Sequence, residues 1–180
     1  MTRFGGTVRH ALVGAAAGLL VAGGSWSGAA IAHAKPNEGT PADINTLAGY
    51  LSKGYNLSNC APQPLLANVV ARLECNRNPD PSGPAGAQYF LFAEPTYVVT
   101  TFKNAIHQPG VTLTNCGNAT SPSTWSDGTT TAGQVACATI EQQGGVAEII
   151  WTNDARNMFG FVRGANPNLA PLYQWWQSNR

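Results

Sequence analysis

The segment that decides the fold runs from Gly133 to Thr152 and reads GQVACATIEQQGGVAEIIWT. It contains two runs rich in Val, Ile and Ala, Gly133–Ile140 and Val146–Thr152, separated by the turn-forming pair Gly144-Gly145. Short apolar runs bounded by glycines are typical of β-strands joined by a hairpin. We therefore expect an antiparallel sheet to be built around this segment.

The same criteria predict further strands on both sides of the hairpin, at Ala67–Cys75, Gln88–Ala93 and Met158–Arg163. The run Gln88–Ala93 is apolar on both faces, which is typical of a central strand. The stretch 78–86 is rich in Pro and Gly, and the stretch 116–132 is rich in Ser, Thr and Gly. Both compositions predict exposed loops.

The first helix is predicted directly after Thr40, whose side chain suits an N-cap and which is followed by a proline at the first helical position. Ile44, Leu47 and Leu51 then form one apolar stripe, and Gly54 is expected to end the element.

Two more helices are predicted from apolar residues at helical spacing. One spans 98–106 and is closed by Pro109-Gly110, and the other begins after Asn168 and carries the stripe Leu169, Leu172, Tyr173 and Trp176. The expected fold class is therefore α+β, with a mostly antiparallel sheet of five or six strands packed against two or three helices.

All four cysteines, Cys60, Cys75, Cys116 and Cys137, lie after residue 34, and their even number predicts two disulfides. Of the three pairings, the sequential one closes two short loops, each stabilising by about 3 kcal/mol. Each half of the chain would then read as a cysteine, a strand with a cysteine, a turn, an apolar strand and a helix, with the extra strand Met158–Arg163 inserted before the last helix. This order suggests an internal duplication.

The N-terminus has the pattern of a secretory signal peptide. Arg3 and Arg9 precede the apolar run Ala11–Gly24, and Ala32-His33-Ala34 matches a cleavage site. The alternative is an uncleaved anchor, but this run is shorter than the roughly 20 residues that span a bilayer. We expect residues 1–34 to be the signal peptide, with cleavage after Ala34, and residues 35–180 to be one secreted domain without a membrane span.

Composition excludes several classes of partner and chemistry. The formal net charge is +1 and only 11% of residues are charged, so nucleic-acid binding is not expected. A single histidine, His107, follows residue 34, and no C-x-x-C pair is present, so neither a metal site nor a cofactor is expected. His107 lies at the end of a predicted helix, where a cation near the C-terminus is favourable without any catalytic role.

Catalysis would depend on acidic residues, since Glu141, Glu148 and Asp154 lie near one another in the sequence. A glycosidase uses such a carboxyl pair, whereas scattered surface acids carry no reaction. We expect no enzyme activity, and convergence of these three residues in one cleft would favour a small cell-wall hydrolase instead.

Two tryptophans are candidates for a binding surface. Trp125 lies in a polar segment, where its ring could stack on a sugar or a peptide unless it folds back over the Cys116–Cys137 pair. Trp175 falls beside the apolar stripe of the last helix and is expected to be partly exposed. A host-facing antigen or protein-interaction factor would show an exposed apolar patch around either ring.

A series of glycine, cysteine and aromatic positions spans nearly the whole chain after residue 34. In order they are Gly54-Tyr55, Cys60, Cys75, Tyr89-Phe90-Leu91-Phe92, Phe102, Cys116, Trp125, Gly133-Gln134-Val135-Ala136-Cys137, Trp151-Thr152 and Leu172-Tyr173-Gln174-Trp175-Trp176. This series resembles an extracytoplasmic domain of actinobacteria, especially mycobacteria. That domain occurs at the C-terminus of some serine/threonine protein kinases and in stand-alone secreted proteins.

The resemblance implies an external sensing or ligand-binding role and carries over no catalytic residues. The expected function is therefore a secreted, non-catalytic binding or sensor-like module of the cell envelope or exterior. Its partner is expected to be an envelope ligand or protein, and the chain is expected to be a monomer.

Overall fold

The computed structural model describes residues 37–180, so the expected signal peptide and its cleavage site lie outside the described residues. Their centre is one antiparallel sheet of eight strands in the order β1-β2-β3-β8-β7-β6-β4, with β5 also paired to β6. The strands are β1 (Cys60–Pro62), β2 (Val69–Cys75), β3 (Gly86–Phe92), β4 (Val111–Thr114), β5 (Ser123–Asp127), β6 (Thr130–Ile140), β7 (Val146–Asn153) and β8 (Met158–Arg163). The fold class is α+β, as expected.

The sheet has more strands than the five or six expected, because β1, β4 and β5 were not predicted. β1 and β4 are only three and four residues long. β5 lies in the polar stretch expected to be a loop, and it pairs with the first part of β6 while β4 pairs with the last part. Edge strands such as these are held through backbone hydrogen bonds, which need no apolar side-chain pattern.

Three helices cover the sheet: α1 (Pro41–Ala48), α2 (Pro95–Ile106) and α3 (Leu169–Asn179). The side chain of Thr40 accepts a hydrogen bond from the backbone N–H of Asp43, as its role as N-cap requires. The first helix ends earlier than predicted, because Gly49 forms its C-cap and Leu51 lies beyond it.

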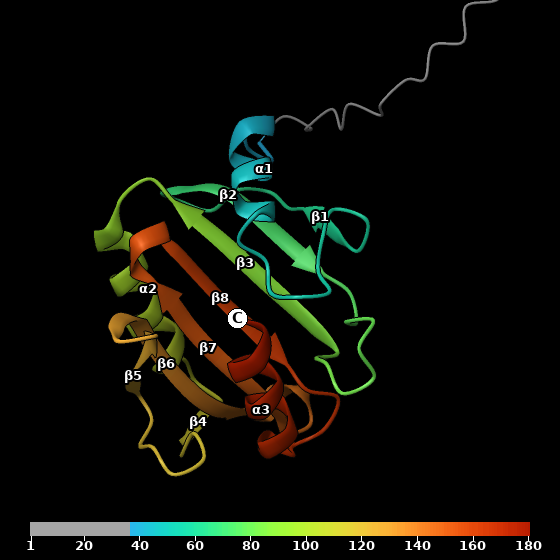
Figure 1. The fold of residues 1–180 in the computed structure, drawn as a ribbon, viewed down its shortest axis with the longest axis vertical. Helices are drawn as coiled ribbons and strands as arrows, with labels where there is room; N and C mark the ends of the chain where they lie inside the picture. Colours follow the sequence, from blue (N-terminus) through green and yellow to red (C-terminus); the bar gives the residue numbers. More distant parts are fainter. Residues whose placement is uncertain (1–36) are drawn as a thin grey trace, which may run out of the picture. The chain divides into compact units, whose positions relative to one another are not determined.

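The helices lie on opposite faces of the sheet. Apolar residues of α1 and α3 join one buried cluster with one set of alternate strand residues, and those of α2 join a second cluster with the other set. In Figure 1, α3 lies in front of the sheet. β3 is buried on both faces, as its unbroken apolar sequence predicted.

The helix that follows each half of the sheet occupies a different face, so the two halves are not simple copies. α2 follows β3 directly, whereas β8 intervenes between β7 and α3. The extra strand reverses the chain before the last helix, and α3 then packs on the face opposite to α2. The helices that follow the two halves therefore pack on opposite faces of the sheet.

Two disulfides join Cys60 to Cys75 and Cys116 to Cys137, which are the sequential pairs, and the described residues hold no free cysteine. Cys60 and Cys75 face each other across β1 and β2. Cys116 follows β4 and is joined to the middle of β6. Both bonds are consistent with an extracellular protein. No helix within residues 37–180 has the length and apolar character needed to cross a membrane.

Removing the second disulfide should weaken the fold measurably. The Cys116–Cys137 bond closes a loop with a sequence separation of 21 residues. The double substitution Cys116→Ser and Cys137→Ser is expected to lower the free energy of unfolding by about 3 kcal/mol, because the unfolded chain gains entropy. Urea unfolding under non-reducing conditions measures this, with Ser123→Ala on β5 as a control. A change below about 1 kcal/mol would contradict the prediction.

Candidate functional site

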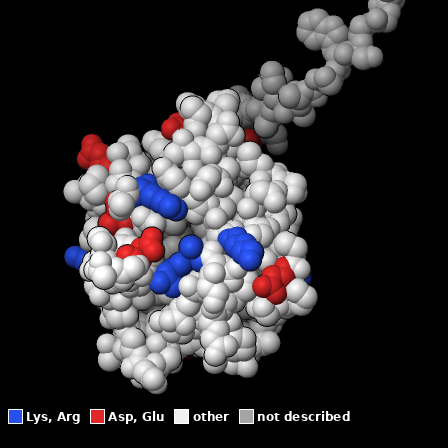
Figure 2. Space-filling view, in the orientation of Figure 1, with Lys and Arg blue, Asp and Glu red and all other residues white. Residues whose placement is uncertain are grey.

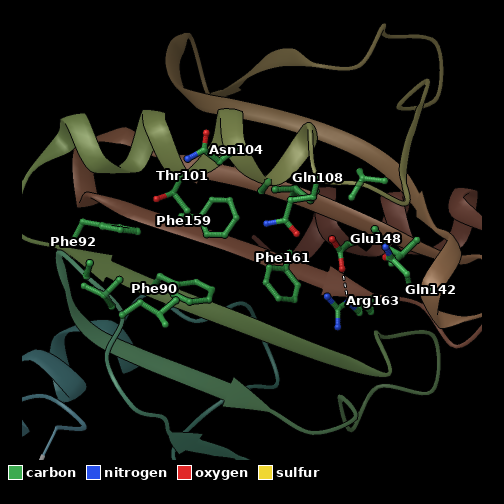
Figure 3. A pocket seen from close by; sticks show the side chains of 17 residues that line it. Phe90, Phe92, Thr101, Asn104, Gln108, Gln142, Glu148, Phe159, Phe161 and Arg163 are labelled. Atoms are coloured by element: carbon green, nitrogen blue, oxygen red, sulfur yellow. Dashed lines mark hydrogen bonds and ion pairs between the residues drawn. The ribbon is translucent and has the colours of Figure 1, made fainter.

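A groove of about 450 Å³ lies beside α2, on the face of the sheet that this helix covers only in part. Figure 3 shows α2 along one side of the groove and the strands β3 and β8 beneath it. Leu66 and Ala67, which precede β2, also line the groove. A cavity of this size, lined by both apolar and polar groups, is typical of a small-molecule site.

The floor of the groove is aromatic. Phe90 and Phe92 of β3 and Phe159 and Phe161 of β8 all point to this face because side chains alternate along a strand. The ring centroids of Phe90 lie 5.5 Å from Phe159 and 6.2 Å from Phe161. Phe90, Phe92 and Phe159 are buried and Phe161 is only partly buried, so Phe161 is the ring that presents apolar surface to the groove.

The wall formed by α2 carries hydrogen-bonding groups that are not used within the fold. Thr101 and Asn104 of α2 line the groove together with Gln108, which lies just beyond the end of the helix, and Figure 3 shows Thr101 and Gln108 pointing toward the phenylalanine rings. Their side chains make no hydrogen bond to any other described residue. These groups are therefore available to a ligand.

One end of the groove is closed by an ion pair between Glu148 of β7 and Arg163 of β8. The two residues are directly opposite each other in the β7–β8 register. Nε of Arg163 donates to Oε2 of Glu148, and the guanidinium lies 4.7 Å from the ring centroid of Phe161. Both contacts fix the orientation of the guanidinium.

The two charges differ in their exposure to water. Glu148 is 4% exposed, whereas the side chain of Arg163 is 31% exposed. Burial raises the pKa of the Glu148 carboxyl above its ordinary value, and the nearby guanidinium opposes this shift only in part. No described residue accepts a hydrogen bond from the terminal nitrogens of Arg163.

The three acidic residues singled out in the sequence do not converge. Glu148 is the only one that lines the groove. Glu141 is exposed and accepts a hydrogen bond from Thr112, and Asp154 accepts one from Thr152 beyond the other end of β7. Six residues of extended strand separate Glu148 from Asp154 by roughly 20 Å. These three residues therefore place only one carboxyl group, that of Glu148, in the groove.

Trp175 is buried at 4% exposure, which corrects the expectation that it is partly exposed. The inner face of α3 is wider than one stripe and includes Leu172, Trp175 and Trp176. The ring of Trp175 meets Tyr55 edge-on, with 6.2 Å between their centroids. It offers no surface for a partner.

Trp125 is half-buried and folds back onto the sheet and α3. Its indole N–H donates to the carbonyl of Thr152 at 2.8 Å, and its ring meets Trp176 edge-on. The guanidinium of Arg180 lies 4.8 Å from its ring centroid. The large apolar side chains that are exposed in the described chain are Leu57, Leu66, Tyr97 and Val99, and neither tryptophan is among them.

The remaining features considered from the sequence are His107, metal-ligating side chains and the distribution of charge. His107 caps α2, with Nδ1 2.7 Å from the carbonyl oxygen of Lys103. No group of three metal-ligating side chains occurs among residues 37–180. Figure 2 shows acidic and basic side chains scattered over one face of the molecule, with wide uncharged areas between them.

The groove was not predicted, although the sequence contains part of its signal. Phe159, Phe161 and Arg163 alternate with residues that point to the other face, as expected for a strand with one distinctive side. Whether a helix covers that side of the strand depends on the tertiary arrangement, which the local sequence does not show.

Comparisons of this chain with family models, curated proteins and solved structures find no match.

Proposed function

We propose that this chain is a secreted, non-catalytic module that binds a small, largely apolar ligand in the groove beside α2. The observation that carries the proposal is the groove itself, in which the partly exposed ring of Phe161 lies beside hydrogen-bonding groups that the fold does not use. A concave site that combines apolar surface with a few polar groups is the usual form of a small-molecule site.

The chemistry of the lining favours binding over hydrolysis. Glu148 is the only acid that faces the groove, and its carboxylate is engaged by Arg163. A glycosidase of the usual kind needs a second carboxyl group across the scissile bond. The two disulfides fit a role outside the cytoplasm. The similarity to the extracytoplasmic kinase domain extends the proposal to a sensor-like role in an actinobacterial envelope.

The groove can be tested with N-phenylnaphthylamine, a neutral probe whose fluorescence rises in apolar surroundings. Ala105 lies on α2 and lines the groove, so Ala105→Trp should fill part of it. We expect this variant to bind the probe at least about tenfold more weakly than the wild type, because the larger ring occupies ligand space. A fluorescence titration gives the two dissociation constants.

The matched control is Ala42→Trp, which places the same ring at an exposed position of α1. This variant should bind the probe as the wild type does. The proposal fails if the wild type leaves the probe fluorescence unchanged, or if both tryptophan variants bind with the same affinity.

A further inference from the structure

We propose that the ligand of the groove is an amphipathic carboxylate whose head group binds Arg163 while its apolar body lies on the phenylalanine floor. The inference rests on the proposed binding function and specifies its ligand class. It assigns Arg163 to recognition of the head group, and Glu148 to the role of an internal competitor for the same cation.

The charge at the end of the groove is the first argument. Glu148 and Arg163 are the only ionisable side chains among the residues that line the groove. Of the two partners in this ion pair, Glu148 is buried and Arg163 is the more exposed. A ligand that enters from water therefore meets the cation, and a negative head group complements it.

The geometry of Arg163 is the second argument. Its Nε is bound to Glu148 and its guanidinium is stacked over Phe161, so the side chain is held in place before a ligand arrives. The terminal nitrogens have no acceptor among the described residues. A guanidinium donates parallel hydrogen bonds that match the two oxygens of a carboxylate, and charge-assisted hydrogen bonds are the stronger kind.

The distribution of polarity is the third argument. Phe161, the ring beside Arg163, is the partly exposed one, and the buried rings of Phe90, Phe159 and Phe92 continue the floor toward the other end of the groove (Figure 3). A molecule with one charged end and an apolar body would satisfy both regions at once. A cationic head would be repelled by Arg163, and a neutral one would leave the charge without a partner from the ligand.

The role of Glu148 follows from the same geometry. Its carboxylate is already hydrogen-bonded to the guanidinium that the ligand carboxylate would contact, and it repels a second negative charge nearby. Replacing it with glutamine keeps the shape of the side chain and removes the charge. This change should therefore strengthen binding of a carboxylate and leave binding of a neutral analogue nearly unchanged.

The test uses decanoate, decanol and acetate at pH 8, with displacement of N-phenylnaphthylamine or calorimetry as the measurement. Two variants are compared, Glu148→Gln and the double variant Glu148→Gln/Arg163→Gln, which differ only in the cation. We expect Glu148→Gln to bind decanoate about threefold to tenfold more tightly than the wild type. The double variant should bind it at least about tenfold more weakly than Glu148→Gln.

Decanol separates the head group from the apolar body, and acetate tests the head group alone. Decanol should bind the wild type and both variants with affinities within about twofold of one another, and acetate should bind far more weakly than decanoate.

The variant Arg72→Gln controls for the loss of a positive charge elsewhere on the protein. Arg72 also stacks on a phenylalanine, Phe90, but it donates to Gln88 and does not line the groove. This variant should change the decanoate affinity by less than about threefold.

The possible failures are distinct. If neither decanol nor decanoate displaces the probe and the probe itself does not bind, the proposed function fails. If decanol and decanoate bind equally well and the double variant matches Glu148→Gln, the groove binds ligands but the carboxylate inference is overturned. Equal losses from Arg72→Gln and from the change at Arg163 would overturn it as well.

Discussion

Gly133→Val is expected to lower the free energy of unfolding by more than about 4 kcal/mol, because a side chain at this position would strike the backbone of the next strand. A Cβ atom added at Gly133 would lie 2.2 Å from the carbonyl oxygen of Thr152. That oxygen belongs to β7, whose backbone is held in the middle of the sheet by β6 and β8. The strand cannot move away without breaking its ladder of hydrogen bonds.

The same collision would disturb the contacts that tie Trp125 to the sheet. The carbonyl of Thr152 accepts the indole N–H of Trp125, and its hydroxyl accepts the backbone N–H of Gln134. Displacing Thr152 would weaken both hydrogen bonds and expose the Trp125 ring. We therefore expect the folded fraction of Gly133→Val, where it survives, to show altered tryptophan fluorescence.

Urea unfolding followed by circular dichroism measures the effect. The control is Ala132→Val, one residue earlier in β6 and partly exposed, which should cost less than about 1 kcal/mol. If Gly133→Val lowers the free energy of unfolding no more than this control does, the close approach of the two backbones is not the reason that position 133 requires a glycine.

Gly133 also illustrates what the sequence could and could not predict about the fold. The strand-forming composition of Gly133–Ile140 predicted β6 well, but it placed the glycine at a strand boundary. In the structure β6 begins at Thr130, and Gly133 lies inside it against β7. Local composition predicts that a segment is extended, whereas the need for a missing side chain arises from a residue distant in sequence.

The candidate site shows the same limit more strongly. Glu148 was considered from the sequence only as one of three neighbouring acids, and Arg163 was not singled out. The hairpin register explains their meeting, because pairing of Asn153 with Met158 brings Glu148 opposite Arg163. The turn was predicted, but its register was not, and a shift of one residue would have sent the two side chains to opposite faces.

Arg163→Gln is expected to lower the free energy of unfolding by about 3 kcal/mol at pH 8, because it leaves the buried Glu148 carboxylate without a counter-ion. Replacing the other partner of the ion pair, Glu148→Gln, should lower the free energy of unfolding much less. The side chain of Arg163 is 31% exposed and can remain solvated without its partner, whereas that of Glu148 is 6% exposed. We therefore expect the two single substitutions to lower the free energy of unfolding by different amounts, because the two partners differ in burial.

The loss of stability caused by Arg163→Gln should depend on pH, because the Glu148 carboxyl that it leaves unpaired can take up a proton. Burial raises the pKa of this carboxyl in the folded protein, and removing the guanidinium removes the opposing influence, so the pKa rises further. Stability from such a group is fully present below the pKa of the unfolded chain, about 4.3, and is lost as the pH rises through the folded-state pKa. The deficit relative to the wild type should therefore be small near pH 4 and largest at pH 8.

Urea unfolding at these two pH values measures the difference, and the double variant Glu148→Gln/Arg163→Gln is the control, since it has no carboxyl group at this position. Its deficit relative to Glu148→Gln should be nearly the same at both values. A deficit in Arg163→Gln that stayed constant, or grew as the pH fell, would mean that Glu148 keeps its charge solvated without Arg163. Arg163 would then be unnecessary for burying the acid, and the predicted dependence of its contribution on pH would be wrong.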